Sequence, residues 1–307
     1  MVTFIHLITA FTIVAEIALG SFANVFILLV NCIDCIKRRK ISSADQILTA
    51  LAIFRVGMLS VILMICCSTV FKPALSLQAT VSICVGWAVT NHFSTWLATT
   101  LSIFYLLKIG NFSNPIFLGL KAKIKSVIVV VLLGSLVLLF PNLMMASISE
   151  AILVNGHRGN LTRKTKLTYV INLTAKMAFT LDNVIPFTIS MICFLLLIYS
   201  LCKHLRTMKL YGKGYQDPSS LVHIKALQAV ISFLLLFSLF FLSLTISGFN
   251  STKPLDDPVH LICQVIGSLY PSCHSFILIW TNKRIKQAFV LAMVQVKAIL
   301  WLREQKP

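Results

Sequence analysis

Seven long apolar runs decide what this chain can fold into. They cover residues 2–30, 47–70, 81–109, 126–147, 177–201, 226–249 and 259–281. Because an α-helix rises about 1.5 Å per residue, about 20 apolar residues cross the hydrocarbon core of a bilayer. The runs lack the alternation of a β-barrel, and a helix satisfies its own backbone polar groups inside lipid. We therefore expect an all-α membrane protein, with residues 1–307 forming a single domain built on a seven-transmembrane helix bundle.

The composition excludes a soluble protein. Only 12% of the residues are charged, whereas soluble domains carry about 25%, and the mean hydropathy is +0.90. A net charge of +18 would suggest nucleic acid in a soluble chain, but these basic residues lie in short connections between apolar runs. They are better explained by membrane topology and anionic membrane lipid, so no nucleic-acid partner is expected.

The sequence carries no catalytic or metal-binding signature. The motifs H-E-x-x-H and G-x-S-x-G, the P-loop and the Rossmann glycine pattern are absent. The nine cysteines lie in or beside apolar runs without the paired spacing of a zinc site, and we expect them to be buried as small hydrophobes. The sequence therefore predicts neither an enzyme nor a cofactor or metal site.

Basic residues predict the orientation of the chain. Most of the 27 Lys and Arg residues lie in the first, third and fifth connections and in the tail after residue 281. Positive charge marks the cytoplasmic side, so we expect the N-terminus outside and the C-terminus inside. The glycosylation sequons at Asn160 and Asn250 then fall outside and are predicted to be used, whereas Asn172 is close to the membrane and Asn111 lies inside.

The tail after the seventh run has its own pattern. Ile285, Phe289, Met293 and Val296 recur at helical spacing between basic residues. This pattern predicts an amphipathic helix over residues 283–301 that lies on the inner leaflet, with its basic side chains facing lipid headgroups.

One group of intramembrane polar residues lies in the first two runs. Glu16 and Asn24 are eight residues apart and share a helical face, and Arg55 lies in the second run. Ionisable groups inside a membrane normally face the bundle interior, so Arg55 is expected to pair with Glu16 or to hydrogen-bond Asn24. We interpret these three residues as a structural polar clamp, with ligand contact as the alternative.

A second group lies toward the external ends of the later runs. Trp87, Asn91 and Thr95 form a stripe at four-residue spacing, and polar residues recur one turn apart in the seventh run. A pocket of this kind suits a small, largely apolar molecule, although a Phe on an apolar helix is more often a packing residue. The candidate ligand-binding residues are Trp87, Asn91, His92, Thr95, Phe179, Asn183, Phe240, Gln264 and Ser268.

Several stretches carry a family resemblance. They are residues 15–27, 45–55, 96–99, 104–109, 111–115, 217–219, 223–228 and 270–279. Phe104-Tyr105-Leu106-Leu107-Lys108 and His274-Ser275-Phe276 occupy the positions of the rhodopsin-like Asp-Arg-Tyr and Asn-Pro-x-x-Tyr signatures, which are missing. Over nearly its whole length the chain resembles the bitter taste receptors, the type 2 taste receptor family.

The resemblance implies a multi-pass, plasma-membrane G-protein-coupled receptor for bitter small molecules, coupled to a gustducin-type heterotrimeric G protein. It implies that Trp87 and Asn91 line the ligand pocket. Gln264 stands where some relatives carry an acidic residue, and Phe240 stands where some carry a Tyr.

The inner ends of the third, fifth and sixth runs carry the residues expected to contact the G protein. The terminal helix of the G protein is expected to enter a cleft bordered by Tyr105, Lys108, His204 and Lys225, with lipid anchoring as the other interpretation of the two lysines. A vomeronasal-type pheromone receptor remains an alternative because it shares the fold and the missing signatures. A transporter or channel would need internal repeats or broken spans, and we see no repeat.

Overall fold

The computed structural model describes residues 2–37, 42–71, 76–155, 161–210, 218–250 and 257–304, and within these ranges it contains helices and no strand. Each of the seven apolar runs lies inside one long helix, which confirms the all-α expectation. The helices are α1 (Val2–Ile36), α2 (Ser43–Phe71), α3 (Leu77–Ile109), α4 (Pro115–Ala122), α5 (Ile124–Asn155), α6 (Leu161–Leu210), α7 (Pro218–Phe249), α8 (Pro258–Thr281) and α9 (Lys283–Glu304).

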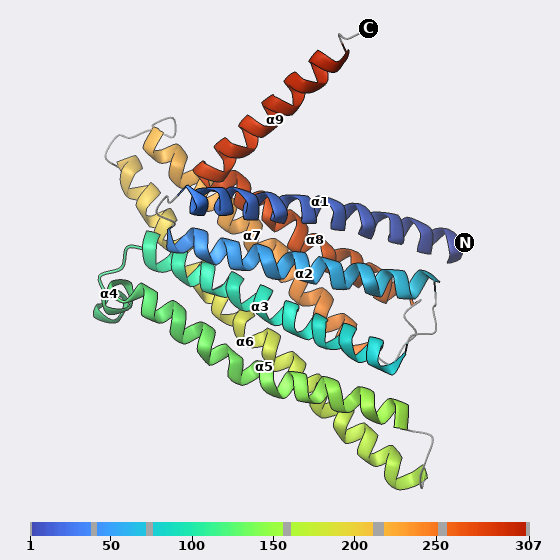
Figure 1. Cartoon of the computed structure of the whole chain (residues 1–307). Coiled ribbons are helices and arrows are strands. Elements are labelled where there is room, and N and C mark those ends of the chain that lie inside the picture. Colours follow the sequence, from blue (N-terminus) through green and yellow to red (C-terminus); the bar gives the residue numbers. More distant parts are fainter. Residues whose placement is uncertain are drawn as a thin grey trace.

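The seven long helices α1, α2, α3, α5, α6, α7 and α8 run side by side as a bundle (Figure 1). Each of them packs against the next one along the chain, and α8 packs against α1, so the ring closes. α3 contacts α2, α5 and α6 and therefore lies in the interior. We call the end of the bundle that carries α4 the inner end, and the opposite end, where α1 begins, the outer end (Figure 1).

Burial of polar side chains explains why α3 lacks the strongly apolar stretch that the other six long helices contain. In the described part of the chain six helices are long and apolar enough to cross a membrane, and α3 is not among them. Asn91, His92, Thr95 and Thr99 lower its hydropathy, and all four are buried. Since α3 turns these groups toward its neighbours, it is the seventh member of a bundle whose outer surface remains apolar.

The polar stretch 148–176, which separates the fourth and fifth apolar runs, is largely helical in the described residues. α5 continues to Asn155 and α6 begins at Leu161. Residues 161–185 contain neither Gly nor Pro, so no helix breaker occurs before Pro186. Hydropathy indicates which residues of a helix lie in lipid. The helix itself can continue into the aqueous phase beyond the membrane surface.

The connection between α3 and α5 contains the short helix α4, which the sequence reasoning did not anticipate. Pro115 occupies its first position, and the Asn114 side chain accepts a hydrogen bond from the Ile116 amide at 2.9 Å. An Asn cap followed by Pro is a typical helix start, so the local sequence did contain the signal.

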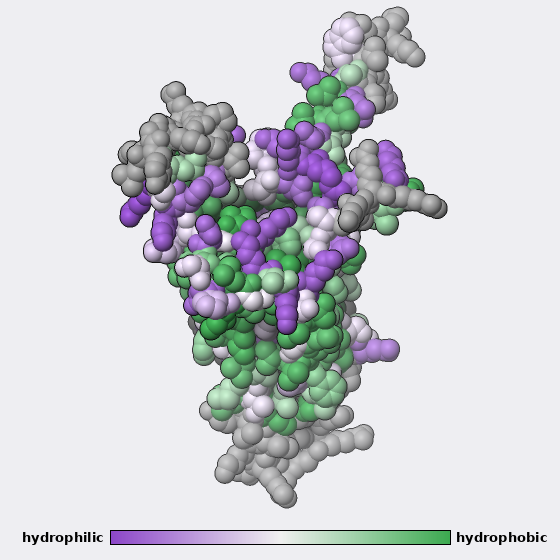
Figure 2. Space-filling model, turned by 90° about the vertical axis from the view of Figure 1, so that its left-hand side faces the viewer, coloured by the Kyte–Doolittle hydropathy of each residue, from purple (hydrophilic) through white to green (hydrophobic). Residues whose placement is uncertain are grey.

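The lateral surface of the bundle is apolar, and hydrophilic side chains gather at the inner end, which Figure 2 faces. Apolar runs therefore supply lipid-facing residues as well as core residues. For this reason the expectation that the cysteines are buried is correct for Cys66, Cys193 and Cys263 but wrong for Cys32, Cys35 and Cys67, which are exposed.

The tail forms α9, which leaves the inner end of the bundle obliquely (Figure 1). Ile285 is fully buried, and the Phe289 ring lies 5.2 Å from that of Phe26 on α1. Arg284 donates to Asp34 of α1 and lies 3.1 Å from the Asp45 carboxylate of α2. These contacts fix the start of α9 to two other helices, and its placement on the inner leaflet stays a prediction.

Candidate functional site

The outer half of the bundle brings four of the predicted ligand-binding residues together at the contact between α3 and α6. The Trp87 and Phe179 rings lie 5.5 Å apart. One turn deeper, Asn91 Nδ2 donates to Asn183 Oδ1 at 3.0 Å, and Asn183 Nδ2 donates to the Phe179 carbonyl at 2.8 Å. Asn91 Oδ1 is buried and accepts no hydrogen bond from the described residues. The contact therefore combines two aromatic faces with one unused acceptor.

A small cavity opens between the outer halves of α6 and α7 beside this contact. Its volume is about 30 Å³, and Phe179 and Asn183 line it together with Phe241 and Thr245 of α7. The Lys176 side chain also lines it, at the outer edge. Drug-sized ligands occupy roughly 300 Å³ or more, so a ligand must displace side chains here in order to bind.

His92 points away from the Trp87–Asn91 stripe, because consecutive residues on a helix differ by about 100° in direction. Its Nδ1 lies 2.7 Å from Asp182 Oδ1 of α6, and both side chains are completely buried. Trp96 Nε1 donates to Asp182 Oδ1 at 3.4 Å, and Asn142 Nδ2 of α5 donates to Asp182 Oδ2 at 3.0 Å. His92 Nε2 lies 3.2 Å from Ser135 Oγ. We call these five residues the Asp182 cluster.

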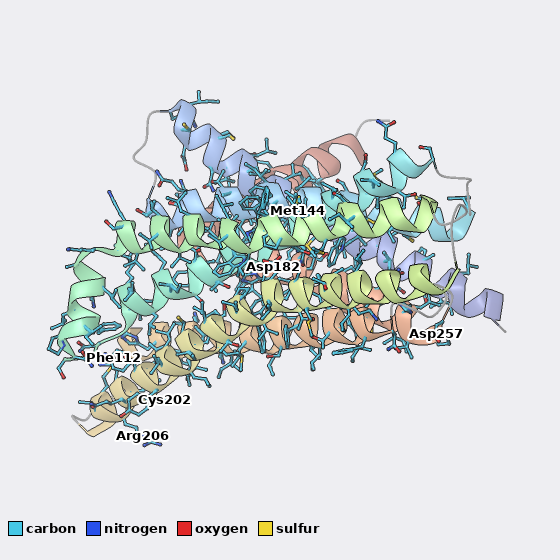
Figure 3. All side chains as sticks on the ribbon, turned by 90° about the horizontal axis from the view of Figure 1, so that it is seen from below. Phe112, Met144, Asp182, Cys202, Arg206 and Asp257 are labelled. Atoms are coloured by element: carbon cyan, nitrogen blue, oxygen red, sulfur yellow. The ribbon has the colours of Figure 1, made fainter. Side chains whose placement is uncertain are left out.

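The Asp182 cluster ties three helices together at the middle of the bundle. Figure 3 shows Asp182 halfway along the molecule, with Phe112, Cys202 and Arg206 near one end and Asp257 near the other. The partners of Asp182 come from α3 and α5 and not from its own helix. The cluster lies directly behind the Asn91–Asn183 pair, since His92 and Asp182 are the chain neighbours of those two residues.

The remaining predicted pocket residues have partners in other parts of the bundle. Thr95 Oγ1 donates to the Asn91 carbonyl at 2.7 Å within α3. Ser268 of α8 donates to the Glu16 carboxylate of α1, and Gln264 is half-buried one turn farther out. Phe240 is buried in the core, with its ring stacked 4.7 Å from Tyr270. Thr95, Ser268 and Phe240 are thus bonded or packed within the protein, away from the Trp87–Phe179 ring contact.

Arg55 and Asn24 are linked through side chains of α8 and not by a direct contact. Arg55 NH1 donates to Ser275 Oγ at 3.1 Å, and NH2 donates to His274 Nδ1 at 2.5 Å. Ser275 Oγ in turn donates to Asn24 Oδ1 at 2.9 Å. The expected direct contact of Arg55 with Glu16 or Asn24 is therefore wrong, because α8 packs against both α1 and α2 and its side chains bridge them.

We call Asn24, Arg55, Tyr270, His274 and Ser275 the Arg55 cluster. The Tyr270 ring lies 4.9 Å from the guanidinium carbon, a cation–π distance. Arg55 is fully buried, and its Nε has no hydrogen-bond partner among the described residues. Sequence reasoning missed His274 and Ser275 as partners, although polar residues following Pro271 on a transmembrane helix were a visible signal.

At the inner end, apolar side chains hold α3, α6 and α7 together. Leu106, Leu197 and Leu201 form a buried cluster, and Leu227 of α7 packs against it. Tyr105 is half-buried at this cluster, whereas Lys108, His204 and Lys225 are exposed. The His204 ring lies 4.7 Å from His223 across the α6–α7 contact. The four predicted inner-face residues thus lie on the three helices whose inner ends meet.

The two predicted glycosylation sites differ in how far they are described. Asn250 directly follows α7 at the outer end, and its Nδ2 donates to the Ile246 carbonyl at 3.1 Å. Asn160 lies outside the described residues.

Comparison with known proteins decides the family. The model of the taste receptor protein (TAS2R) family matches residues 1–297. The chain belongs to this family. Taste receptor type 2 member 136 of the rat is 69% identical to it over 100% of this chain and 93% of the rat protein. The mouse protein of the same name is 64% identical over the full length of both chains, and human taste receptor type 2 member 31 is 52% identical over 100% of this chain and 99% of the human one.

Membership of the TAS2R family fixes the class of activity. The chain is a bitter taste receptor of the G-protein-coupled type, a multi-pass protein of the plasma membrane, and not an enzyme. The pheromone-receptor and transporter alternatives are not favoured, because full-length relatives at this identity are taste receptors. Small-molecule ligands and G-protein coupling follow from the family.

Proposed function

We propose that bitter agonists bind in the outer half of the bundle, at the junction of α3, α6 and α7. The observation that carries this proposal is the buried Asn91 Oδ1 beside the Trp87–Phe179 contact, to which none of the described residues donates a hydrogen bond. A buried acceptor without a partner costs about 1–3 kcal/mol, so a ligand N–H or O–H group that reaches it gains affinity. The aromatic faces select a flat, largely apolar molecule.

The other predicted pocket residues have indirect roles in this proposal. His92 and Thr95 fix the orientation of α3, since both hydrogen-bond within the protein. Ser268 fixes α8 on α1 through Glu16. Phe240 conveys displacement of α7 toward Tyr270 and the Arg55 cluster, because the rings of Phe240 and Tyr270 are stacked. Gln264 borders the outer opening, where a neutral amide gives no preference for cationic ligands.

Agonist binding shifts a population between two arrangements of the bundle. To enter the cavity of about 30 Å³, a ligand must push α7 away from α6 through Phe241 and Thr245. The same two helices meet at the inner end through Leu197 and Leu227, so the arrangement that the ligand favours is one in which this inner contact opens. A difference in affinity of a few kcal/mol between the two arrangements is sufficient for a strong response.

The partner at the inner face is a gustducin-type heterotrimeric G protein. Opening of the inner contact exposes apolar surface bordered by Tyr105, Lys108, His204 and Lys225. Apolar surface ringed by basic groups suits an amphipathic helix that ends in a carboxylate. The membrane lipid anchors the same inner end through the basic connections and α9.

Substitution of Asn91 tests the ligand site. Asn91→Ala removes the free acceptor and should raise the agonist concentration for half-maximal calcium response about tenfold, with surface expression unchanged. Ser82→Ala is the matched control, because Ser82 is exposed on the outer half of α3 and donates only to its own helix at the Gln78 carbonyl. Unchanged potency of Asn91→Ala and Trp87→Ala across chemically varied bitter agonists would place the ligand elsewhere.

A further inference from the structure

Two thiols lie close together on the exposed surface at the inner end of α1. Cys32 and Cys35 are three residues apart, so their side chains point to the same side of the helix, and both are free and exposed. Their neighbours Leu29, Ile33 and Ile36 are also exposed, by 55%, 48% and 81%. In a receptor that spans the membrane, an apolar surface of this kind faces lipid. Cys32 and Cys35 therefore present two thiols to lipid.

Contacts on the neighbouring face of the same turns fix the depth of these thiols. Asn31 and Asp34 are buried and bond to Arg284 at the start of α9. Lys37, one residue after α1 ends, is exposed. Charged and polar groups thus begin within one helical turn, about 5 Å, of both cysteines. The thiols lie in the last two turns of α1, at the level where its apolar surface ends. Figure 1 shows that α9 begins beside this end of α1.

We propose that Cys32 and Cys35 are S-acylated by long-chain acyl groups. In this reaction the cysteine sulfur attacks the thioester carbonyl of an acyl-coenzyme A. A new carbon–Sγ bond forms, the bond to the coenzyme A sulfur breaks, and the thiol proton passes to the released coenzyme A thiolate, without any oxidation or reduction. Membrane-bound acyltransferases act on cysteines at this level of the bilayer.

The surroundings suit the product. Acyl chains attached at Cys32 and Cys35 can lie along the exposed Leu29 and Ile33 toward the centre of the bilayer. α9 contains no cysteine, so α1 is the element at this corner of the bundle that can carry such an anchor. The chains would hold the inner end of α1, and through the Asp34–Arg284 contact the start of α9, at the inner leaflet.

Acyl exchange on the full-length receptor in mammalian cells tests the proposal. Free thiols are blocked, thioesters are cleaved with hydroxylamine, and the released thiols are labelled with a maleimide polymer that adds a fixed mass. The wild type should gain two hydroxylamine-dependent mass steps. The Cys32→Ser and Cys35→Ser variants should each gain one step, and the double variant should gain none. Cys67→Ser is the matched control, because Cys67 is equally free and exposed but lies at the outer end of α2, and it should retain both steps.

Two results would overturn the proposal. One is a wild type without hydroxylamine-dependent label. The other is a label at the wrong cysteine, seen as label that persists in the double variant or as label that disappears in Cys67→Ser. The single variants keep the test decisive if the double variant reaches the surface poorly, since each must lose exactly one step. The outcome does not depend on which agonist the receptor binds.

Discussion

The Arg55 and Asp182 clusters both place an ionisable group inside the bundle, but they satisfy it to different degrees. Asp182 accepts from Trp96 and Asn142 and contacts His92, so donors from α3 and α5 converge on its two oxygens. Arg55 contacts only a hydroxyl, an imidazole and an aromatic ring, and its Nε has no partner among the described residues. No carboxylate in the described part of the chain forms an ion pair with it.

This difference separates a rigid region from a region that can rearrange. A buried network with all members paired holds its helices in one arrangement, whereas a network with an unused donor has alternatives of similar energy. We therefore expect α3, α5 and α6 to stay together at Asp182 during activation. We expect α7 and α8 to move instead. On these helices the Tyr270 ring stacks on Phe240 and also contacts the Arg55 guanidinium.

Removal of Asp182 should have the largest effect. Asp182→Ala leaves Trp96 and Asn142 without their acceptor and separates His92 from its carboxylate, which should cost about 3–5 kcal/mol of stability. We expect most of the receptor to be lost from the cell surface and a large fall in its thermal midpoint in detergent. Ser135→Ala, which removes the contact to His92 Nε2 and a bond to the Leu132 carbonyl within α5, should cause a much smaller fall. Equal midpoints for Asp182→Ala and wild type would show that the cluster does not hold the bundle.

The Asp182 cluster also marks the limit of what the sequence could predict. The apolar runs located all seven long helices, although α3 is not apolar enough for hydropathy alone to mark it as a membrane span. Spacing correctly put Trp87 and Asn91 on one side of α3, where their partners Phe179 and Asn183 lie. The spacing of residues along one helix, however, does not show which neighbouring helix each of its faces contacts. The sequence therefore could not show that His92 contacts Asp182 instead of joining the pocket.

The Arg55 cluster shows the same limit across the chain. Arg55 and its partners Ser275 and His274 are 220 and 219 residues apart in sequence, and only the packing of α8 against α2 joins them. The sequence did not predict that α6 extends outward from residue 177 to Leu161. Hydropathy shows which part of a helix is surrounded by lipid, but it does not show where the helix ends.

Close packing of α1 on α8 gives an intermediate effect. A Cβ at Gly20 would lie 2.3 Å from Ser272 Oγ and 2.9 Å from its Cα, so Gly20→Ala forces the two helices apart. We expect a loss of about 1–3 kcal/mol, read as a lower thermal midpoint. Gly134→Ala is the matched control, because no atom lies within 4 Å of its added Cβ, and it should leave the midpoint unchanged. A shift as large with Gly134→Ala would contradict the steric explanation.

Replacement of Arg55 should have the smallest effect on stability and a clear effect on signalling. Arg55→Leu removes a buried charge that forms no ion pair with any described carboxylate, while Ser275 keeps its bonds to Asn24 and to the Pro271 carbonyl. The thermal midpoint should fall much less than in Asp182→Ala, and basal or maximal G-protein signalling per surface receptor should change. A larger loss of stability in Arg55→Leu than in Asp182→Ala would reverse the comparison.

Nucleotide exchange with purified components tests the central claim most directly. Wild-type receptor in lipid nanodiscs, with a bitter agonist and a gustducin-type heterotrimer, should accelerate GTP uptake by the G protein. Asn91→Ala should need a higher agonist concentration for the same acceleration, and Ser82→Ala should match the wild type. Two results would contradict the account. One is a rate of nucleotide exchange that no agonist increases in folded wild-type receptor, and the other is the same agonist concentration dependence in Asn91→Ala as in the wild type.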